Sequence, residues 1–228
     1  MKEQDYKKFT EILHDAFSVS EDTASNRVIR TRLQDAGKVT GTNMCMMVCA
    51  NIIACIGLNS GQMTVVIGAM LIEPLMGSIL MITYSMAAAN KKEFKDHGLG
   101  FLFQITACLI ASTLYFLITP VKAPTAELMA FSQPTVFEVL VAFVGGVAGV
   151  IGQTRRDKVN TIIPGVAIAT ALMPPLCACG YGIATLNGPM FLGSAYMFLV
   201  NVYFIALGSC IVLSLFNIPK DKEMTEEE

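Results

Sequence analysis

Long apolar runs separated by short polar connectors fill the chain from residue 41 onward. Six of these runs approach the roughly 20 apolar residues that a helix needs to cross a bilayer. They are Thr42–Leu58, Met63–Met86, Leu99–Thr119, Val136–Gly152, Asn160–Ala184 and Met190–Phe216. We therefore expect an all-α polytopic membrane protein whose six transmembrane helices occupy residues 41–217.

The first 40 residues have a different pattern, because they are polar and charged. Apolar residues recur at helical spacing within Asp5–Phe17, which predicts an amphipathic helix, and a second polar helix is expected over Asp22–Ala36. We interpret residues 1–40 as a cytoplasmic, solvated segment that skims the membrane, with a regulatory or partner-docking role as the alternative. Residues 218–228 are expected to form a disordered cytoplasmic tail.

Charge gives this pattern an orientation. Charged residues make up 15% of the 228 residues, against roughly 25% in an average soluble domain. The two tails and the second and fourth connectors hold 15 of the 16 Lys and Arg residues, and Lys122 lies in the third connector. Because Lys and Arg concentrate on the cytoplasmic side, both termini are predicted to be cytoplasmic. The net charge of −2 also argues against a nucleic-acid partner.

The second and fifth runs resemble each other when the sequence is shifted by 101 residues. Residues 65–75 then lie over residues 166–176 with five of eleven positions identical, and Pro74 lies over Pro175. A proline inside a helix removes an amide donor and clashes with the preceding turn, so helices two and five should be broken at mid-membrane.

The repeat also predicts how the two halves are related. Each copy contains three helices, about 41–119 and about 136–216, and an odd number places the copies in the membrane in opposite directions. Inverted repeats of this kind, with interrupted helices, occur in many secondary transporters. Two ordinary proline kinks in a structural bundle are the alternative.

Glu73 lies in the middle of the second run, immediately before Pro74. A charged group at this depth costs at least ~2.5–3.5 kcal/mol, so Glu73 should face a cavity, bind a cation or stay protonated. We interpret it as a ligand for substrate, Na⁺ or H⁺. The alternative is a protonated Glu73 bonded to an opened backbone carbonyl. The further candidate site residues are Pro74, Asn51, Thr170, Pro174, Pro175 and Asn201.

The remaining sequence features bear on oligomer contacts, metal or cofactor sites and enzyme activity. Glycines at small-xxx-small spacing in the fourth run favour close helix contacts, within a subunit or between the subunits of a homo-oligomer. Met and Cys are frequent in the runs, but both are ordinary packing residues, so neither a metal site nor a cofactor is expected. The runs contain neither a carboxylate dyad nor an intramembrane His that could activate a Ser, which argues against an enzyme.

Three stretches are similar to a known family. They are residues 57–60, residues 66–77 and residues 164–176, which include the proline motifs. Over roughly residues 40–216 the chain resembles the hydrophobic prokaryotic membrane proteins called domain of unknown function 389. The resemblance implies a bacterial or archaeal plasma (inner) membrane and supplies no substrate. Glu73 departs from the family motif, which has a small residue before this proline, so a mechanism based on Glu73 would be peculiar to this protein or its subfamily.

Together these features favour a small secondary transporter for an ion or a small polar solute. Amides freed after Pro74 and Pro175 would attract an anionic or zwitterionic solute to a midplane site, and Glu73 would attract Na⁺ or H⁺. An oligomeric ion channel is one alternative. A non-transporting scaffold or accessory subunit, docking partners through residues 1–40, is the other.

Overall fold

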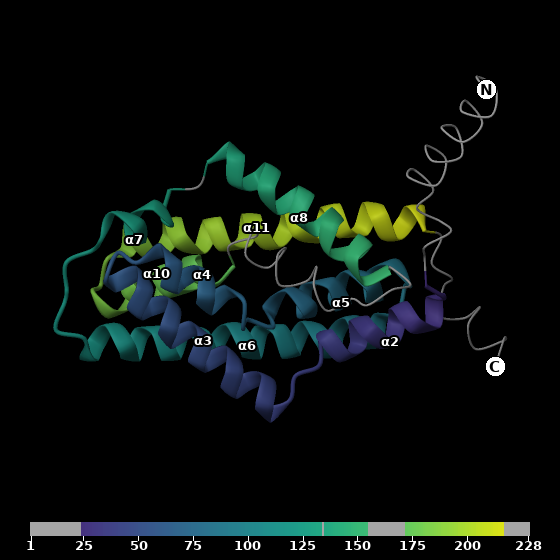
Figure 1. The fold of residues 1–228 in the computed structure, drawn as a ribbon, viewed down its shortest axis with the longest axis horizontal. Coiled ribbons are helices and arrows are strands. Elements are labelled where there is room, and N and C mark those ends of the chain that lie inside the picture. The colour runs from purple at the N-terminus through teal and green to yellow at the C-terminus, as the bar shows by residue number, and fades with distance from the viewer. Residues whose placement is uncertain (1–23, 134, 155–171, 217–228) are drawn as a thin grey trace, which may run out of the picture.

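The computed structural model describes residues 24–133, 135–154 and 172–216, and all regular elements in these ranges are α-helices (Figure 1). The helices are α2 (Asn26–Ala36), α3 (Gly41–Asn59), α4 (Met63–Met70), α5 (Leu75–Ala87), α6 (Lys91–Ile118), α7 (Ala126–Ala130), α8 (Val136–Thr154), α10 (Met173–Ala184) and α11 (Gly188–Leu215). The all-α prediction is confirmed for these ranges. The predicted helix Asp5–Phe17 and the predicted tail 218–228 lie outside them.

Four helices, α3, α6, α8 and α11, are long and apolar enough to cross a membrane. Helices α4 and α5 pass the same test together, with a 45° bend at the break between them, which gives up to five candidate spans among the described residues. These helices correspond to five of the six predicted runs and indicate a multi-pass membrane protein. The fifth run, Asn160–Ala184, is described only from residue 172, so the six-helix count stays a prediction.

Helix α6 begins eight residues before the predicted start of its run at Leu99. The side chain of Asn90 accepts hydrogen bonds from the backbone N–H groups of Lys92 and Glu93, at 3.1 and 3.0 Å. This cap satisfies amides that a helix end otherwise leaves open, so the helix extends into a charged stretch that hydropathy alone does not include.

Helix α2 closes one end of the bundle, opposite α7 (Figure 1). Its Ile29 and Leu33 are 1% and 0% exposed, and Arg30 forms an ion pair of 2.7 Å with Glu93 of α6. The backbone N–H of Ala24, just before α2, donates to the Thr154 carbonyl of α8 at 2.7 Å. The polar helix predicted here therefore forms, but it packs on the bundle, in contrast to the solvated segment expected from its polarity.

At the opposite end, hydrogen bonds join the connector between α6 and α7 to α3 and α10. Thr125 donates to the Leu58 carbonyl at 2.6 Å, and the Tyr181 hydroxyl donates to the Lys122 carbonyl at 2.7 Å. The 28 residues of α6 connect the two ends, a distance of roughly 42 Å at 1.5 Å per residue. The described basic residues apart from Lys122 lie toward the α2 end, as the charge pattern requires. Which side of the membrane this end faces stays a prediction.

Two parts of the bundle have matching construction. Helices α3 and α8 have 19 residues each, α5 and α10 have 13 and 12, and α6 and α11 have 28 each. In the turn before each 28-residue helix a non-glycine residue has positive φ, 55° at Ala89 and 54° at Leu186. The next residue, Asn90 or Asn187, caps the helix with its side chain.

The matching turns lie 97 residues apart, whereas the sequence comparison aligned positions 101 residues apart. The difference of four residues is about one helical turn, so it preserves the helix face but changes which residues are equivalent. Pro74 therefore does not correspond to Pro175: it precedes α5, whereas Pro174 and Pro175 lie inside the first turn of α10.

Helices α8 and α11 approach each other so closely that their backbones touch. A Cβ atom on Gly146 would collide with the Ile205 carbonyl, and one on Gly208 would collide with the Phe143 carbonyl. The Ser209 hydroxyl also donates to the Gly146 carbonyl at 3.1 Å. We call this the α8–α11 glycine contact. It accounts for the glycine spacing within one chain, so that spacing no longer argues for a homo-oligomer.

Candidate functional site

The break between α4 and α5 separates Met70 from Leu75 in the middle of a membrane-length segment. Pro74 is the N-cap residue of α5 and has no capping side chain, so the first amides of α5 are not satisfied by a side-chain cap. Leu71 and Ile72 of the break are 49% and 39% exposed on the outer surface. The chain interruption thus lies at the bundle surface, but its one charged residue turns inward.

The carboxyl group of Glu73 reaches the start of α10. It accepts a hydrogen bond from the backbone N–H of Met173, the first residue of that helix, while its Oε1 atom is buried without a hydrogen-bond partner. Pro174 and Pro175 have no N–H, so Met173 holds the one amide proton among the first three residues of α10. Glu73 therefore caps α10 from a segment 100 residues earlier in the chain.

This contact is electrostatically favourable for a carboxylate. A negative group at a helix N-terminus gains typically ~0.3–1 kcal/mol, and up to about 2 kcal/mol in partly buried geometries. The partner recorded for Glu73 is an amide of another helix, in contrast to the carbonyl of its own kink that the alternative interpretation named.

Asn51 joins α3 to the same turn of α10. Its Nδ2 lies 3.2 Å from Met173 Sδ and 3.5 Å from Cys177 Sγ, and its side chain is fully buried. Sulfur is a weak acceptor, so these hydrogen bonds hold the helices less firmly than bonds to oxygen would. We call Glu73, Met173, Asn51 and Cys177 the broken-helix junction.

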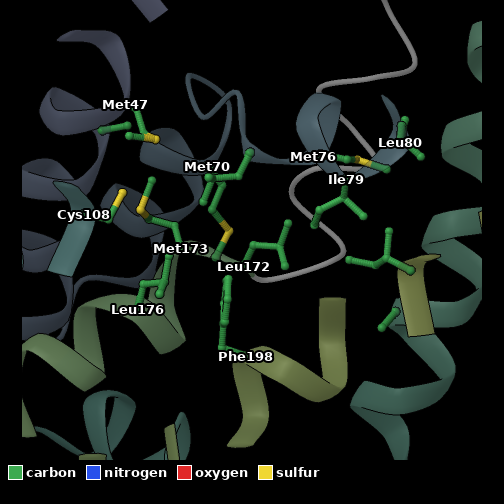
Figure 2. Packing of buried hydrophobic residues seen from close by; sticks show 14 of the residues in the cluster. Met47, Met70, Met76, Ile79, Leu80, Cys108, Leu172, Met173, Leu176 and Phe198 are labelled. Carbon is green, nitrogen blue, oxygen red and sulfur yellow. The ribbon is translucent and has the colours of Figure 1, made fainter. Parts of the chain in front are cut away.

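Sulfur atoms and apolar side chains surround the junction. Cys108 of α6 and Cys177 lie near Glu73, and Cys55 of α3 contacts Cys177. Met70, Leu172, Met173 and Phe198 belong to the adjoining core (Figure 2). Within the described ranges, no group of three or more His, Cys, Asp or Glu side chains is arranged to hold a metal ion.

The structure brings together most of the candidate residues named from the sequence. Glu73, Pro74, Asn51, Pro174 and Pro175 are at the junction or adjacent to it. Asn201 is 2% exposed within α11. Thr170 lies outside the described residues.

Sequence reasoning missed two contributors, Cys55 and Cys108, and it placed Met173 at the midplane site only as part of the half-helix end with Pro174 and Pro175. Met173 takes part through its backbone N–H, which its residue type does not reveal. Cys55 is four residues after Asn51 on one helix face, a signal that could have been read. No pattern in the sequence connects Cys108 with Glu73.

Comparison with known proteins places this geometry in a family. A family model described as Domain of unknown function (DUF389) matches residues 70–207, more than half of the chain. The chain belongs to this family. The matched region begins at the end of α4 and includes Glu73, α10 and most of α11, so it contains most of the junction.

An uncharacterized protein of Methanocaldococcus jannaschii is 23% identical to the chain over 206 residues, which cover 89% of the chain and 64% of that relative. The chain therefore spans less than two thirds of the relative's length. No solved structure matches the chain.

Proposed function

We propose that this member of the family is a small secondary transporter for an ion or a small polar solute. The contact between Glu73 and the Met173 amide carries the proposal, because it joins an interrupted membrane segment to the start of another helix. A buried carboxylate is costly in a bilayer and is usually retained for function. Secondary transporters place substrate and ion sites where interrupted helices meet.

The matching halves of the bundle support the same proposal. Closely matching helix lengths and the matching turns at Ala89 and Leu186 favour two three-helix repeats in a six-helix domain. In our proposal the repeats are inverted, and they exchange conformations to expose the junction to one side of the membrane and then to the other.

The site chemistry suggests a solute with a negative group. The N-terminal ends of α5 and α10 are positive dipole ends that attract a carboxylate or another anion. Glu73 contributes a negative charge that a coupling cation, Na⁺ or H⁺, would balance. Cotransport of an anionic or zwitterionic solute uses both features.

The first test is a thermal-shift screen of the purified chain against Na⁺, K⁺, chloride, phosphate and a metabolite set, followed by uptake of each stabilising compound into proteoliposomes. A ligand that binds only the folded state raises the apparent stability as its concentration rises. We expect Glu73→Gln to abolish or alter the cation dependence of uptake.

Glu138→Gln is the matched control. The Glu138 carboxylate accepts from the Thr135 N–H at 2.8 Å at the start of α8, away from the junction. The control should transport as the wild type does. Unchanged cation dependence in Glu73→Gln would contradict the proposal.

The alternatives predict other results. A channel would show single-channel conductance far above carrier turnover, but the α8–α11 glycine contact lies within one chain and so gives no support to a pore between subunits. A scaffold or accessory subunit would co-purify stably with another protein and give no ligand response.

A further inference from the structure

Among the described residues, sulfur-containing side chains lie near the Glu73 carboxylate. Of the described titratable side chains on neighbouring helices, the thiols of Cys108 and Cys177 lie near it, and the Cys55 thiol lies near both. Tyr196 and Tyr203 of α11 are each 61% exposed on the outer surface. Sulfur groups, hydrocarbon and the Asn51 side-chain amide therefore make up the described environment of Glu73.

This environment suits a proton better than Na⁺. Hard cations take several oxygen ligands, whereas thiol and thioether groups select soft metals. The nearby Sδ of Met173 and Sγ of Cys177 already accept from Asn51. A proton needs one oxygen, and Glu73 Oε1 is buried with no hydrogen-bond partner.

We propose that the coupling ion is a proton, which Glu73 binds when its contact with the Met173 amide opens and releases when the contact closes. The inference rests on the proposed transport function and names its coupling ion. In the closed contact the carboxylate accepts from the Met173 N–H, and the dipole of α10 stabilises its negative charge.

Opening removes both of these stabilising interactions. The α4–α5 break moves away from α10, and the carboxylate is left among thiols and apolar groups. One O–H bond then forms between a carboxylate oxygen and a proton from water on the side to which the junction is open. The junction then opens to the other side of the membrane, where the O–H bond breaks and the proton passes to water. The carboxylate returns to its contact with the Met173 N–H.

One substitution removes the charge of Glu73 while keeping the shape of its side chain, and a second serves as the control. Glu73→Gln is permanently neutral and mimics the protonated state, so it should favour the open contact. Glu138→Gln makes the same chemical change in α8 and is the control. Cys177 reports on opening, because it is buried one turn after Met173, whereas Cys45 of α3 is exposed and serves as the reference.

The experiment measures modification of the full chain by N-ethylmaleimide, with mass spectrometry resolving Cys177 from Cys45. At one pH, the ratio of the two labelling rates should rise roughly fivefold in Glu73→Gln, the factor for losing about 1 kcal/mol of charge–dipole stabilisation. The control should match the wild type. Equal ratios in all three proteins would overturn the inference.

A second series varies the ions. Lowering the pH should raise the labelling ratio of the wild type and leave that of Glu73→Gln unchanged, since the variant has no proton to bind. If Glu73→Gln does not fold, the wild-type series alone decides. Replacing Na⁺ by K⁺ at constant ionic strength should have no effect. A ratio that follows Na⁺ and ignores pH would overturn the proton assignment.

Proteoliposomes with a trapped pH-sensitive dye separate the two proposals. Solute uptake that moves Na⁺ and no protons would refute the coupling ion and leave the transport function standing. A pH-dependent contact in a protein that moves neither protons nor any screened solute would refute the transport function, while the proton-linked contact would stand as a sensor.

Discussion

The α8–α11 glycine contact and the broken-helix junction lie in one helical bundle, but they are built in opposite ways. At the first, two continuous helices meet backbone to backbone, without space for a Cβ atom on Gly146 or Gly208. At the second, an interrupted segment meets the start of α10 through one carboxylate, one amide and weak bonds to sulfur.

The difference indicates which part of the bundle can rearrange. Even a small separation of the two helices would remove the favourable packing of their backbones, because dispersion contacts weaken steeply with distance. Opening a contact that depends on one amide and on sulfur acceptors costs little free energy, provided that the carboxylate can be neutralised. We therefore expect α8 and α11 to move as one unit and the junction to be where conformations change.

The largest expected effect comes from filling the glycine contact. Gly146→Ala places a methyl group against the Ile205 carbonyl and should lower the free energy of unfolding by about 2 kcal/mol. Gly98→Ala in α6 is the control, because a Cβ there meets nothing within 4 Å. It should be neutral or slightly stabilising, since alanine favours helix more than glycine does. Thermal unfolding in detergent measures both, and equal midpoints would refute the description of a rigid contact.

An intermediate effect should separate oxygen from sulfur acceptors. Gln104→Leu leaves the buried Ser78 hydroxyl without its acceptor at 2.8 Å and should cost about 1 kcal/mol. Asn51→Leu leaves two sulfur atoms without a donor and the Cys55 thiol without its acceptor, and because bonds to and from sulfur are weak it should cost about half as much or less. The comparison uses chemical denaturation of both variants. A larger loss for Asn51→Leu would mean that the junction is held more firmly than its sulfur acceptors suggest.

The smallest effect tests whether a hydrogen bond adds to the glycine packing. Ser209→Ala removes the donor to the Gly146 carbonyl and should cost about 0.6 kcal/mol, the average for such bonds in membrane helices. Ser214→Ala is the control, because that hydroxyl bonds within α11 to the Cys210 carbonyl. A loss near 2 kcal/mol for Ser209→Ala would show that the bond, in addition to packing, holds the two helices.

The apolar runs predicted α3, α8 and α11 to within about two residues at each end, because membrane length and apolarity constrain these helices. The repeat was harder to place. Matches among apolar residues arise readily by chance, and they favoured a shift of 101 residues. A shift of 97 residues instead aligns residues 84–90 with residues 181–187, which share a Tyr, an Ala and an Asn. This shorter match identifies the corresponding turns, because each turn and its Asn cap need those residues at that spacing.

The two broken-helix ends at the candidate site were predictable, but the atomic contact between them was not. Glu73 could be identified because a carboxylate in an apolar run is costly wherever the chain folds. Its partner could not be identified, since the Met173 amide is a backbone group and any residue type except proline offers one. The burial of α2 could not be predicted either. It depends on a close approach between the end of α2 and α5 at Gly37 and Gly77, which the sequence of either segment alone does not indicate.

The two prolines in the first turn of α10 have a consequence for stoichiometry. An ordinary helix start offers several amides and can hold two acceptors together, whereas α10 offers the single amide of Met173 among its first three residues. Another acceptor would therefore compete with Glu73 for the Met173 N–H. Because Pro174 and Pro175 have no N–H, the first turn of α10 can donate to one acceptor at a time through Met173, so a solute that binds there would displace Glu73.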